Sequence, residues 1–102
     1  MQSCVTCGMP FEGNHEGDIG MTIAEGPVCV HDCENGKLKS PEGIFDGGVA
    51  FFAMYTNGDK ALAERLCRKN MNYLPYWTAH HFAELDGEQV TNEEYHTILA
   101  KL

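Results

Sequence analysis

The fold of this chain is organised around the stretch Cys4-Val5-Thr6-Cys7-Gly8-Met9-Pro10-Phe11. Two cysteines separated by two residues and followed by glycine are typical of a knuckle, a compact loop that aims two sulfurs at one point. Gly8 suits this loop, because the residue after the second cysteine often needs a positive φ, which glycine adopts at little cost. The spacing therefore predicts half of a metal site, with Cys4 and Cys7 as ligands.

A second cysteine pair follows in the stretch Cys29-Val30-His31-Asp32-Cys33. It can close a four-thiolate cage, whose usual occupant is tetrahedral zinc. The sequence thus predicts a closed, structural Zn²⁺ site with four ligands: Cys4, Cys7, Cys29 and Cys33. Two other interpretations exist. Free cysteines are often buried as small hydrophobes, and Cys-x-x-Cys can be a redox pair, although the βαβ pattern of such a pair does not follow here.

The composition is that of a single small domain or of one domain with an appendage. The chain has 102 residues, of which 43% are hydrophobic, enough for a core. No apolar run approaches the roughly 18 residues needed to cross a bilayer, and the N-terminus lacks the basic flank and apolar segment of a secretory signal. We therefore expect no membrane association and a cytoplasmic location, where cysteine pairs more often hold metal than form disulfides.

The charge of the chain is strongly acidic. Fifteen Asp and Glu residues against seven Lys and Arg give a formal net charge of −8. Binding to nucleic acid draws much of its free energy from Lys and Arg that neutralise phosphates. The charge therefore argues against a nucleic-acid partner, and the modest basic group at residues 65–69 is interpreted as a solvated helix face.

The segment between the cysteine pairs predicts a short β-hairpin. Residues 12–20 are polar and glycine-rich and are expected to form a loop. Residues 21–24 alternate between apolar and polar side chains, which is typical of a strand. Gly26-Pro27 is expected to turn the chain back towards Val28 and Cys29.

The rest of the chain is expected to be helical. Three residues have the side chains that cap helix N-termini, namely Ser40, Asp59 and Thr91. The helices that they predict span residues 41 to about 54, 60 to about 73, and 92–102. Pro75 should end the second helix, and the single tryptophan, Trp77, is expected to anchor the core. Cys67 has no neighbouring cysteine and is interpreted as a core residue, whereas a reactive thiol there would need an electropositive, partly exposed setting.

His80-His81-x-x-Glu84 raises the possibility of a second metal site, because His80 and Glu84 would share a helix face. The pattern lacks the second histidine of a zincin, and no further ligands lie nearby in the sequence. We therefore expect no catalytic metal in this segment.

The pattern of the N-terminal half resembles the zinc ribbon domain family of small prokaryotic proteins. The similarity lies in the Cys-Gly-Met-Pro signature after the first knuckle cysteine, the glycine-rich spacer, the second cysteine pair and the later Asn35-Gly36-Lys37-Leu38 and Ser40-Pro41-Glu42. The similarity extends over roughly residues 3–77, and it is weaker at Leu74-Pro75-Tyr76-Trp77, which resembles the end of the helical segment of the family. The resemblance implies a zinc-binding module, and some members of the family are attached to transcription-regulator domains.

The sequence departs from the family pattern at the fourth ligand. Counted back from Gly36, the fourth cysteine of the family falls on Asp32, whereas this chain has a cysteine one residue later. Either the loop absorbs the shift and Cys33 is the ligand, or His31 or Asp32 takes the fourth position. Thiolate is the better ligand in a closed structural zinc site, so the sequence favours Cys33.

These inferences together predict a small α+β fold. A zinc ribbon of knuckles and a short β-hairpin, residues 1–40, should be followed by a helical extension of about three helices, residues 41–102, packed with the ribbon as one unit. The expected function is that of a non-enzymatic zinc-binding structural and interaction module with a protein partner, acting as a regulatory accessory protein. The alternatives are a nucleic-acid-binding or transcription-associated ribbon and, with less support, a zinc enzyme or thiol switch. The sequence leaves the oligomeric state, the identity of the partner and the role of residues 78–102 open.

Overall fold

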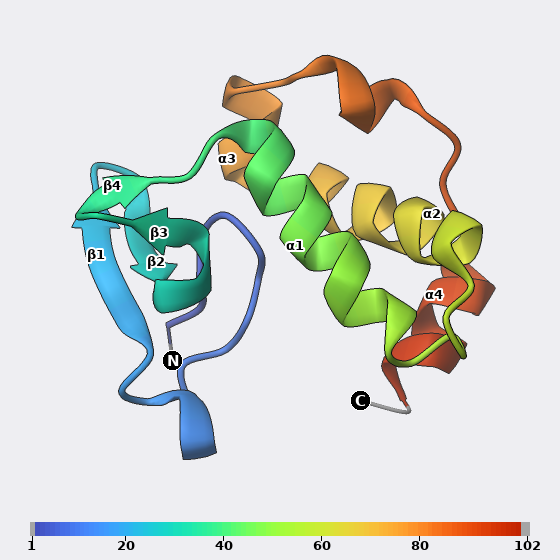
Figure 1. The fold of residues 1–102 in the computed structure, drawn as a ribbon, viewed down its shortest axis with the longest axis horizontal. Coiled ribbons are helices and arrows are strands. Elements are labelled where there is room, and N and C mark those ends of the chain that lie inside the picture. Colours follow the sequence, from blue (N-terminus) through green and yellow to red (C-terminus); the bar gives the residue numbers. More distant parts are fainter. Residues whose placement is uncertain (1, 101–102) are drawn as a thin grey trace.

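The computed structural model describes residues 2–100 and has two parts (Figure 1). A loop and two small antiparallel hairpins form the N-terminal part, and helices form the other. The strands are β1 (Ile19–Ile23), β2 (Gly26–Cys29), β3 (Cys33–Glu34) and β4 (Lys37–Leu38). The α-helices are α1 (Pro41–Ala53), α2 (Lys60–Asn72), α3 (Pro75–Ala79) and α4 (Asn92–Leu99). The predicted α+β class is therefore confirmed.

The first hairpin, β1–β2, lies where the sequence predicts it, but its turn is different. Met21 pairs with Val28 and Ile23 pairs with Gly26, so the two turn residues are Ala24 and Glu25. The expectation that Gly26-Pro27 forms the turn is wrong. Both residues belong to β2, because Gly26, with φ 141°, takes a strand position that few other residues adopt easily.

The second hairpin, β3–β4, follows from two turn residues. Asn35 and Gly36 both have positive φ, 54° and 75°, which is the conformation of a tight type I′ turn. Cys33 pairs with Leu38 and Glu34 pairs with Lys37 across this turn. The hairpin ends at Leu38, shortly before the start of α1 at Pro41.

Three helices begin at the capping residues that the sequence indicates. The Ser40 hydroxyl accepts a hydrogen bond from the Gly43 N–H at 3.0 Å, and the Asp59 carboxylate accepts one from the Leu62 N–H at 3.1 Å. Thr91 and Glu94 form a reciprocal capping box. These bonds satisfy backbone donors that the first turn of a helix leaves without a partner.

The described residues contain four α-helices, one more than the approximate number predicted. Pro75 follows the end of α2 as expected, but it also occupies the first turn of the short helix α3, where its fixed φ is favourable. A 3₁₀ turn, Ala83–Asp86, connects α3 to α4. The final helix is confirmed as far as Leu99, and the predicted continuation through residues 101–102 lies outside the described residues.

The buried side chains form two clusters, a large one and a small one. The large cluster lies among the helices and includes Leu66, Met71 and Trp77, which is 1% exposed. The expectation that Trp77 anchors the core is confirmed. The small cluster in the N-terminal part has only four buried members: Cys4, Phe11, Val28 and Cys29. Leu38 packs against both clusters.

Hydrogen bonds join the two parts at the first knuckle. The Trp77 indole Nε1–H donates to the Thr6 carbonyl at 2.9 Å, and the Asn70 side-chain amide donates to the Cys7 carbonyl at 2.9 Å. The Tyr95 hydroxyl, from α4, donates in turn to the Asn70 side-chain oxygen at 3.0 Å. Residues from α2, α3 and α4 therefore contribute to holding the loop that presents two of the predicted metal ligands.

Two adjacent glycines of α1 predict opposite effects of substitution by alanine. A Cβ at Gly48 would lie 2.6 Å from the sulfur of the buried Cys67, whereas a Cβ at Gly47 would meet nothing within 4 Å. We expect Gly48→Ala to lower the free energy of unfolding by about 1–2 kcal/mol through overpacking. Gly47→Ala should raise it by about 0.5–1 kcal/mol, since glycine is a poor residue for a helix interior. Urea unfolding of the two variants at low protein concentration measures both effects, and equal effects of the same sign would contradict the packing described.

Candidate metal centre

Three sulfurs and one carboxylate converge in the N-terminal part. One ligand atom from each of Cys4, Cys7, Cys29 and Asp32 lies within 4.8 Å of those of the other three. Cys4, Cys29 and Asp32 are buried, and Cys7 is half-buried. Two separate segments thus contribute two side chains each to the group, Cys4 and Cys7 from the first and Cys29 and Asp32 from the second.

The first segment is a tight loop closed by backbone hydrogen bonds. The Gly8 N–H donates to the Cys4 carbonyl at 2.8 Å, and the Cys4 N–H donates to the Met9 carbonyl at 2.9 Å. Gly8 has φ +81°, the left-handed conformation that the sequence leads us to expect after the second knuckle cysteine. The loop therefore directs the sulfurs of Cys4 and Cys7 to the same side.

The second segment places Asp32 beside the sulfurs by means of one turn of 3₁₀ helix. Cys29 ends β2, and the turn Val30–Asp32 follows it at once. The Cys29 N–H donates to the Cys4 sulfur at 3.3 Å, which ties the two segments together. Asp32 is only 7% exposed although it carries a carboxylate, and buried carboxylates need a compensating partner.

Thr6 supplies part of that compensation. Its hydroxyl donates to Asp32 Oδ2 at 2.6 Å, and the same hydroxyl oxygen lies 3.2 Å from the Cys4 sulfur. Hydrogen bonds of this kind fix the orientation of metal ligands and are as much a part of a site as the ligands themselves. Thr6 is not among the residues predicted for the site, and the sequence signal that could have indicated it is its place between the two knuckle cysteines.

Cys33, which the sequence favours as the fourth ligand, is not a member of the group. Its thiol points back to its own segment and donates to the Cys29 carbonyl at 3.2 Å. His31 is exposed and also lies outside the group. The alternative that Asp32 takes the fourth position matches the geometry, and it agrees with the count back from Gly36.

The protonation of the three sulfurs is strongly linked. Hydrogen bonds from the Cys29 thiol and then from the Cys7 thiol hold the pKa of Cys4 far below its usual range. Donation to Cys4 raises the pKa of Cys29 to about 12, and hydrogen bonding with Cys29 and Cys4, together with burial, raises that of Cys7 still further. Burial also raises the pKa of Asp32, while the bond from Thr6 opposes the rise. Burial and mutual hydrogen bonding thus make it costly to ionise all four groups together without a compensating positive charge, which a divalent cation would supply as it replaces protons.

Two of the distances within the group are close to those expected around a tetrahedral ion with zinc–ligand bond lengths. Zn–S bonds of about 2.3 Å and a Zn–O bond of about 2.0 Å place two sulfurs about 3.8 Å apart and a sulfur and an oxygen about 3.5 Å apart. The sulfurs of Cys7 and Cys29 are 3.6 Å apart, and the Cys4 sulfur lies 3.5 Å from Asp32 Oδ2. Cys4, Cys7, Cys29 and Asp32 therefore lie close enough together to hold a metal ion.

The other residues that the sequence analysis considered for chemistry lie elsewhere. Burial raises the pKa of Cys67 to about 12, and its thiol donates to the Phe45 carbonyl at 3.5 Å, as expected of a core residue. The ring of His80 lies 2.9 Å from the Glu25 carboxylate, in the turn of the first hairpin. His81 instead contacts Asp86 at 2.7 Å. Among residues 2–100, the histidines of this segment thus form no metal-binding group with Glu84.

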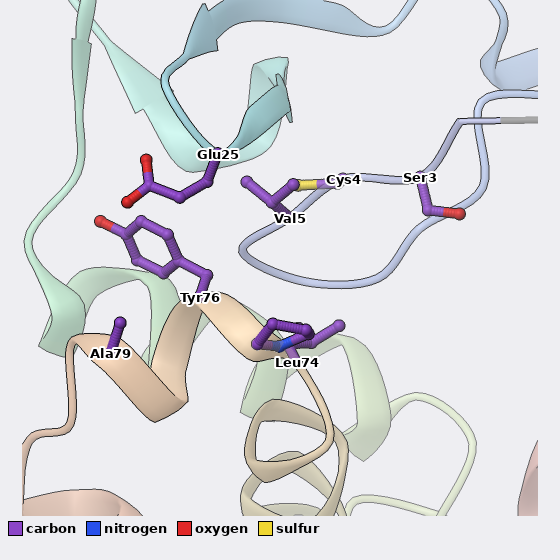
Figure 2. Close-up of a pocket in the computed structure, with 8 residues that line it drawn as sticks. Ser3, Cys4, Val5, Glu25, Leu74, Tyr76 and Ala79 are labelled. Carbon is purple, nitrogen blue, oxygen red and sulfur yellow. The ribbon is translucent and has the colours of Figure 1, made fainter.

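A cleft of about 390 Å³ opens between the knuckle and α3, next to the candidate site (Figure 2). Val5, Leu74 and Ala79 give it mainly apolar walls. Figure 2 shows the Glu25 carboxylate and the Tyr76 hydroxyl close together at one end of the cleft, away from Cys4. The cleft lies between the two parts of the fold. Cys4 and Glu25 are the two lining residues whose side chains are of a kind that commonly binds metal, and Glu25 is not part of the converging group.

Within the part of the chain that the structure describes, no helix is both long enough and apolar enough to cross a bilayer. Comparisons of the sequence with family models and with curated proteins, and of the fold with solved structures, find no match.

Proposed function

We propose that this protein is a zinc-binding structural and interaction module. The observation that supports this function is the convergence of Cys4, Cys7, Cys29 and Asp32, whose ligand atoms all lie within 4.8 Å of one another. The ion would have a folding role, because the small N-terminal cluster contains only four buried residues, two of them ligands. Small zinc domains commonly depend on their metal for this reason.

The proposed site is closed and not catalytic. Three sulfurs and one carboxylate fill a tetrahedral shell, and a catalytic zinc needs a position for water or substrate. Three of the four ligands are buried, which further restricts access. The proposed activity is therefore binding, and the helical part would present the contact surface to another protein, as in a regulatory accessory protein.

The identity of the fourth ligand gives a direct test of the site. We expect Asp32→Ala to weaken zinc binding by about 100-fold or more, because it removes a ligand and leaves the Thr6 hydroxyl without its acceptor. Asp32→Cys should retain one zinc ion per chain, since thiolate is a good zinc ligand. Competition with a chromophoric chelator measures the affinity, and mass spectrometry under native conditions measures the stoichiometry.

Cys33→Ser is the matched control, because Cys33 is adjacent in sequence but its thiol bonds only to a carbonyl in the structure. It should bind zinc as tightly as the unmodified chain. The reverse result, with Cys33→Ser losing zinc and Asp32→Ala retaining it, would give the fourth position to Cys33. A reduced, folded protein that takes up no metal at all would contradict the proposed function.

A further inference from the structure

The final helix, α4, lies on the side of the helical part away from the strands (Figure 1). Of its eight residues, two have buried side chains, Tyr95 and Ile98. Helices in proteins owe most of their stability to the packing of an apolar face, so a helix with two buried side chains is held by a small contact. Each interaction of these two residues should therefore contribute a large share of the docking of α4.

The side chain of Tyr95 is connected to the metal loop in two steps. Its hydroxyl donates to Asn70 Oδ1 at 3.0 Å, and Asn70 Nδ2 donates to the Cys7 carbonyl at 2.9 Å. Tyr95 is buried and Asn70, on α2, is half-buried, so both bonds are partly shielded from water. A single side chain thus connects α4 to a residue of the converging group.

The Asn70 amide needs both bonds in order to stay in place. A side-chain amide has a donor nitrogen and an acceptor oxygen on its two sides, and here each side has one partner. With the nitrogen on the Cys7 carbonyl, the oxygen of this half-buried amide needs a donor, which Tyr95 supplies. Without the hydroxyl the amide would be fixed at one end only, and it could turn away from Cys7.

The bond from Asn70 completes the support of one peptide group, the one that joins Cys7 to Gly8. The Gly8 N–H of this group donates to the Cys4 carbonyl at 2.8 Å, and its carbonyl, that of Cys7, accepts from Asn70 at 2.9 Å. The orientation of this peptide group sets the direction in which the Cys7 side chain leaves the backbone. Loss of hydrogen bonds that hold metal ligands in place typically lowers metal affinity 10- to 100-fold.

We propose that Tyr95 is a positioning residue for the metal centre, acting through Asn70, and that the docking of α4 is coupled in this way to metal binding. The coupling is reciprocal. A docked α4 holds Cys7 in position for the ion, and the ion, by ordering the loop, gives Asn70 the carbonyl to which it donates. The inference rests on the proposed zinc-binding function, and it makes α4 the element through which the helical part responds to the metal.

The first experiment compares the zinc affinity of the full chain and of two α4 variants by competition with a chromophoric chelator. Tyr95→Phe removes the hydroxyl but keeps the ring against Tyr73, with centroids 5.6 Å apart. It should raise the dissociation constant about three- to tenfold, as expected for the loss of one hydrogen bond. Ile98→Val is the matched control, because it changes the other buried side chain of α4 at a similar cost in stability, and it should leave zinc affinity unchanged.

The second experiment tests the route through Asn70. Asn70→Ala alone should weaken zinc binding about tenfold or more, because the Cys7 carbonyl loses its donor. Tyr95→Phe added to Asn70→Ala should then have no further effect, since the hydroxyl no longer has a path to the loop. Circular dichroism checks that each variant is folded before its affinity is measured.

The third experiment observes the Cys7 carbonyl directly by NMR of the zinc-loaded chain. Cys7-Gly8 is the one Cys-Gly step in the sequence, so ¹³C-carbonyl cysteine combined with ¹⁵N-glycine gives a single coupled carbonyl signal. Because hydrogen bonding moves a carbonyl ¹³C resonance downfield, Tyr95→Phe and Asn70→Ala should both move this signal upfield. Ile98→Val should not, and a residue that only stabilised α4 would produce no such difference.

The reciprocal effect is measured by hydrogen exchange of the α4 amides with zinc and after chelation. Exchange should be slower with zinc, and the difference should shrink in Tyr95→Phe but not in Ile98→Val.

Four results would overturn the inference. Tyr95→Phe could bind zinc as tightly as the unmodified chain, Ile98→Val could weaken binding equally, the effects of Asn70→Ala and Tyr95→Phe could add, or α4 exchange could be independent of zinc. Each of these results leaves the proposed function intact, whereas a folded chain that takes up no zinc would contradict both.

Discussion

Chelation of the proposed zinc ion is expected to unfold residues 2–39 and to shift the fluorescence of Trp77 to longer wavelength. The N-terminal part has too small a core to remain folded alone, and structural zinc supplies about 10–16 kcal/mol of apparent binding free energy in small zinc domains. Trp77 reports on the change because its indole N–H donates to the Thr6 carbonyl, between two ligands. Far-UV circular dichroism should keep most of its helical signal, since the buried cluster among the helices is the larger of the two.

Trp77 is the single tryptophan of the chain, so the emission has one source. Addition of zinc under reducing conditions should restore the original spectrum. Cys67→Ser provides a control, because Cys67 lies in the helical cluster and its loss should leave the zinc response in place. A chelated sample that is free of metal by elemental analysis, yet shows unchanged fluorescence and unchanged proteolysis of residues 2–39, would contradict a folding role for the ion.

Trp77→Ala should lower the free energy of unfolding by about 3–5 kcal/mol, the typical cost of removing a large buried aromatic residue. Trp77 contacts Tyr76 and Phe82 edge to face, with ring centroids 4.7 and 5.1 Å apart. Trp77→Phe keeps part of the packing but leaves the Thr6 carbonyl without its donor, which costs about 1–3 kcal/mol. Chemical denaturation followed by circular dichroism measures both variants.

The two Trp77 variants also separate packing from the link to the metal loop. Zinc affinity should fall in Trp77→Phe as well as in Trp77→Ala, because the carbonyl that loses its donor belongs to the knuckle. Tyr73→Ala is a suitable comparison, since its exposed side chain should contribute less than about 1 kcal/mol. Destabilisation by Tyr73→Ala equal to that by Trp77→Ala would show that the large cluster is not organised around Trp77.

The parts of the fold that sequence predicts correctly depend on residues close together in the chain. The caps at Ser40 and Asp59 bond to backbone groups three residues away, so the local pattern contains both partners. The knuckle at Cys4 and Cys7 is equally local. By contrast, a proline such as Pro75 is compatible both with the end of one helix and with the first turn of the next. The sequence predicts only the end of α2, whereas in the structure Pro75 also begins α3.

The fourth member of the converging group is the clearest case of information that a local pattern lacks. Ligand chemistry favours Cys33, since thiolate suits zinc better than carboxylate. The 3₁₀ turn after Cys29 instead brings Asp32 to the hydroxyl of Thr6, far away in the sequence. That contact forms only when the two segments meet, and it fixes which of two adjacent residues points inward. The count from Gly36 is the one sequence signal that indicates Asp32.

The position of Leu38 has a consequence for the design of truncated variants of this protein. Leu38 is shared by both groups of buried side chains, and the carbonyls of Thr6 and Cys7 are capped by side chains from the helices. Truncation after residue 40 would expose Leu38 on the N-terminal fragment and leave the carbonyls of Thr6 and Cys7 without their hydrogen-bond donors. The C-terminal fragment would contain the two donors, Trp77 and Asn70, without these acceptors. The predicted boundary between the ribbon, residues 1–40, and the helical extension is therefore a poor place for truncation, and both parts should be kept together in biophysical work.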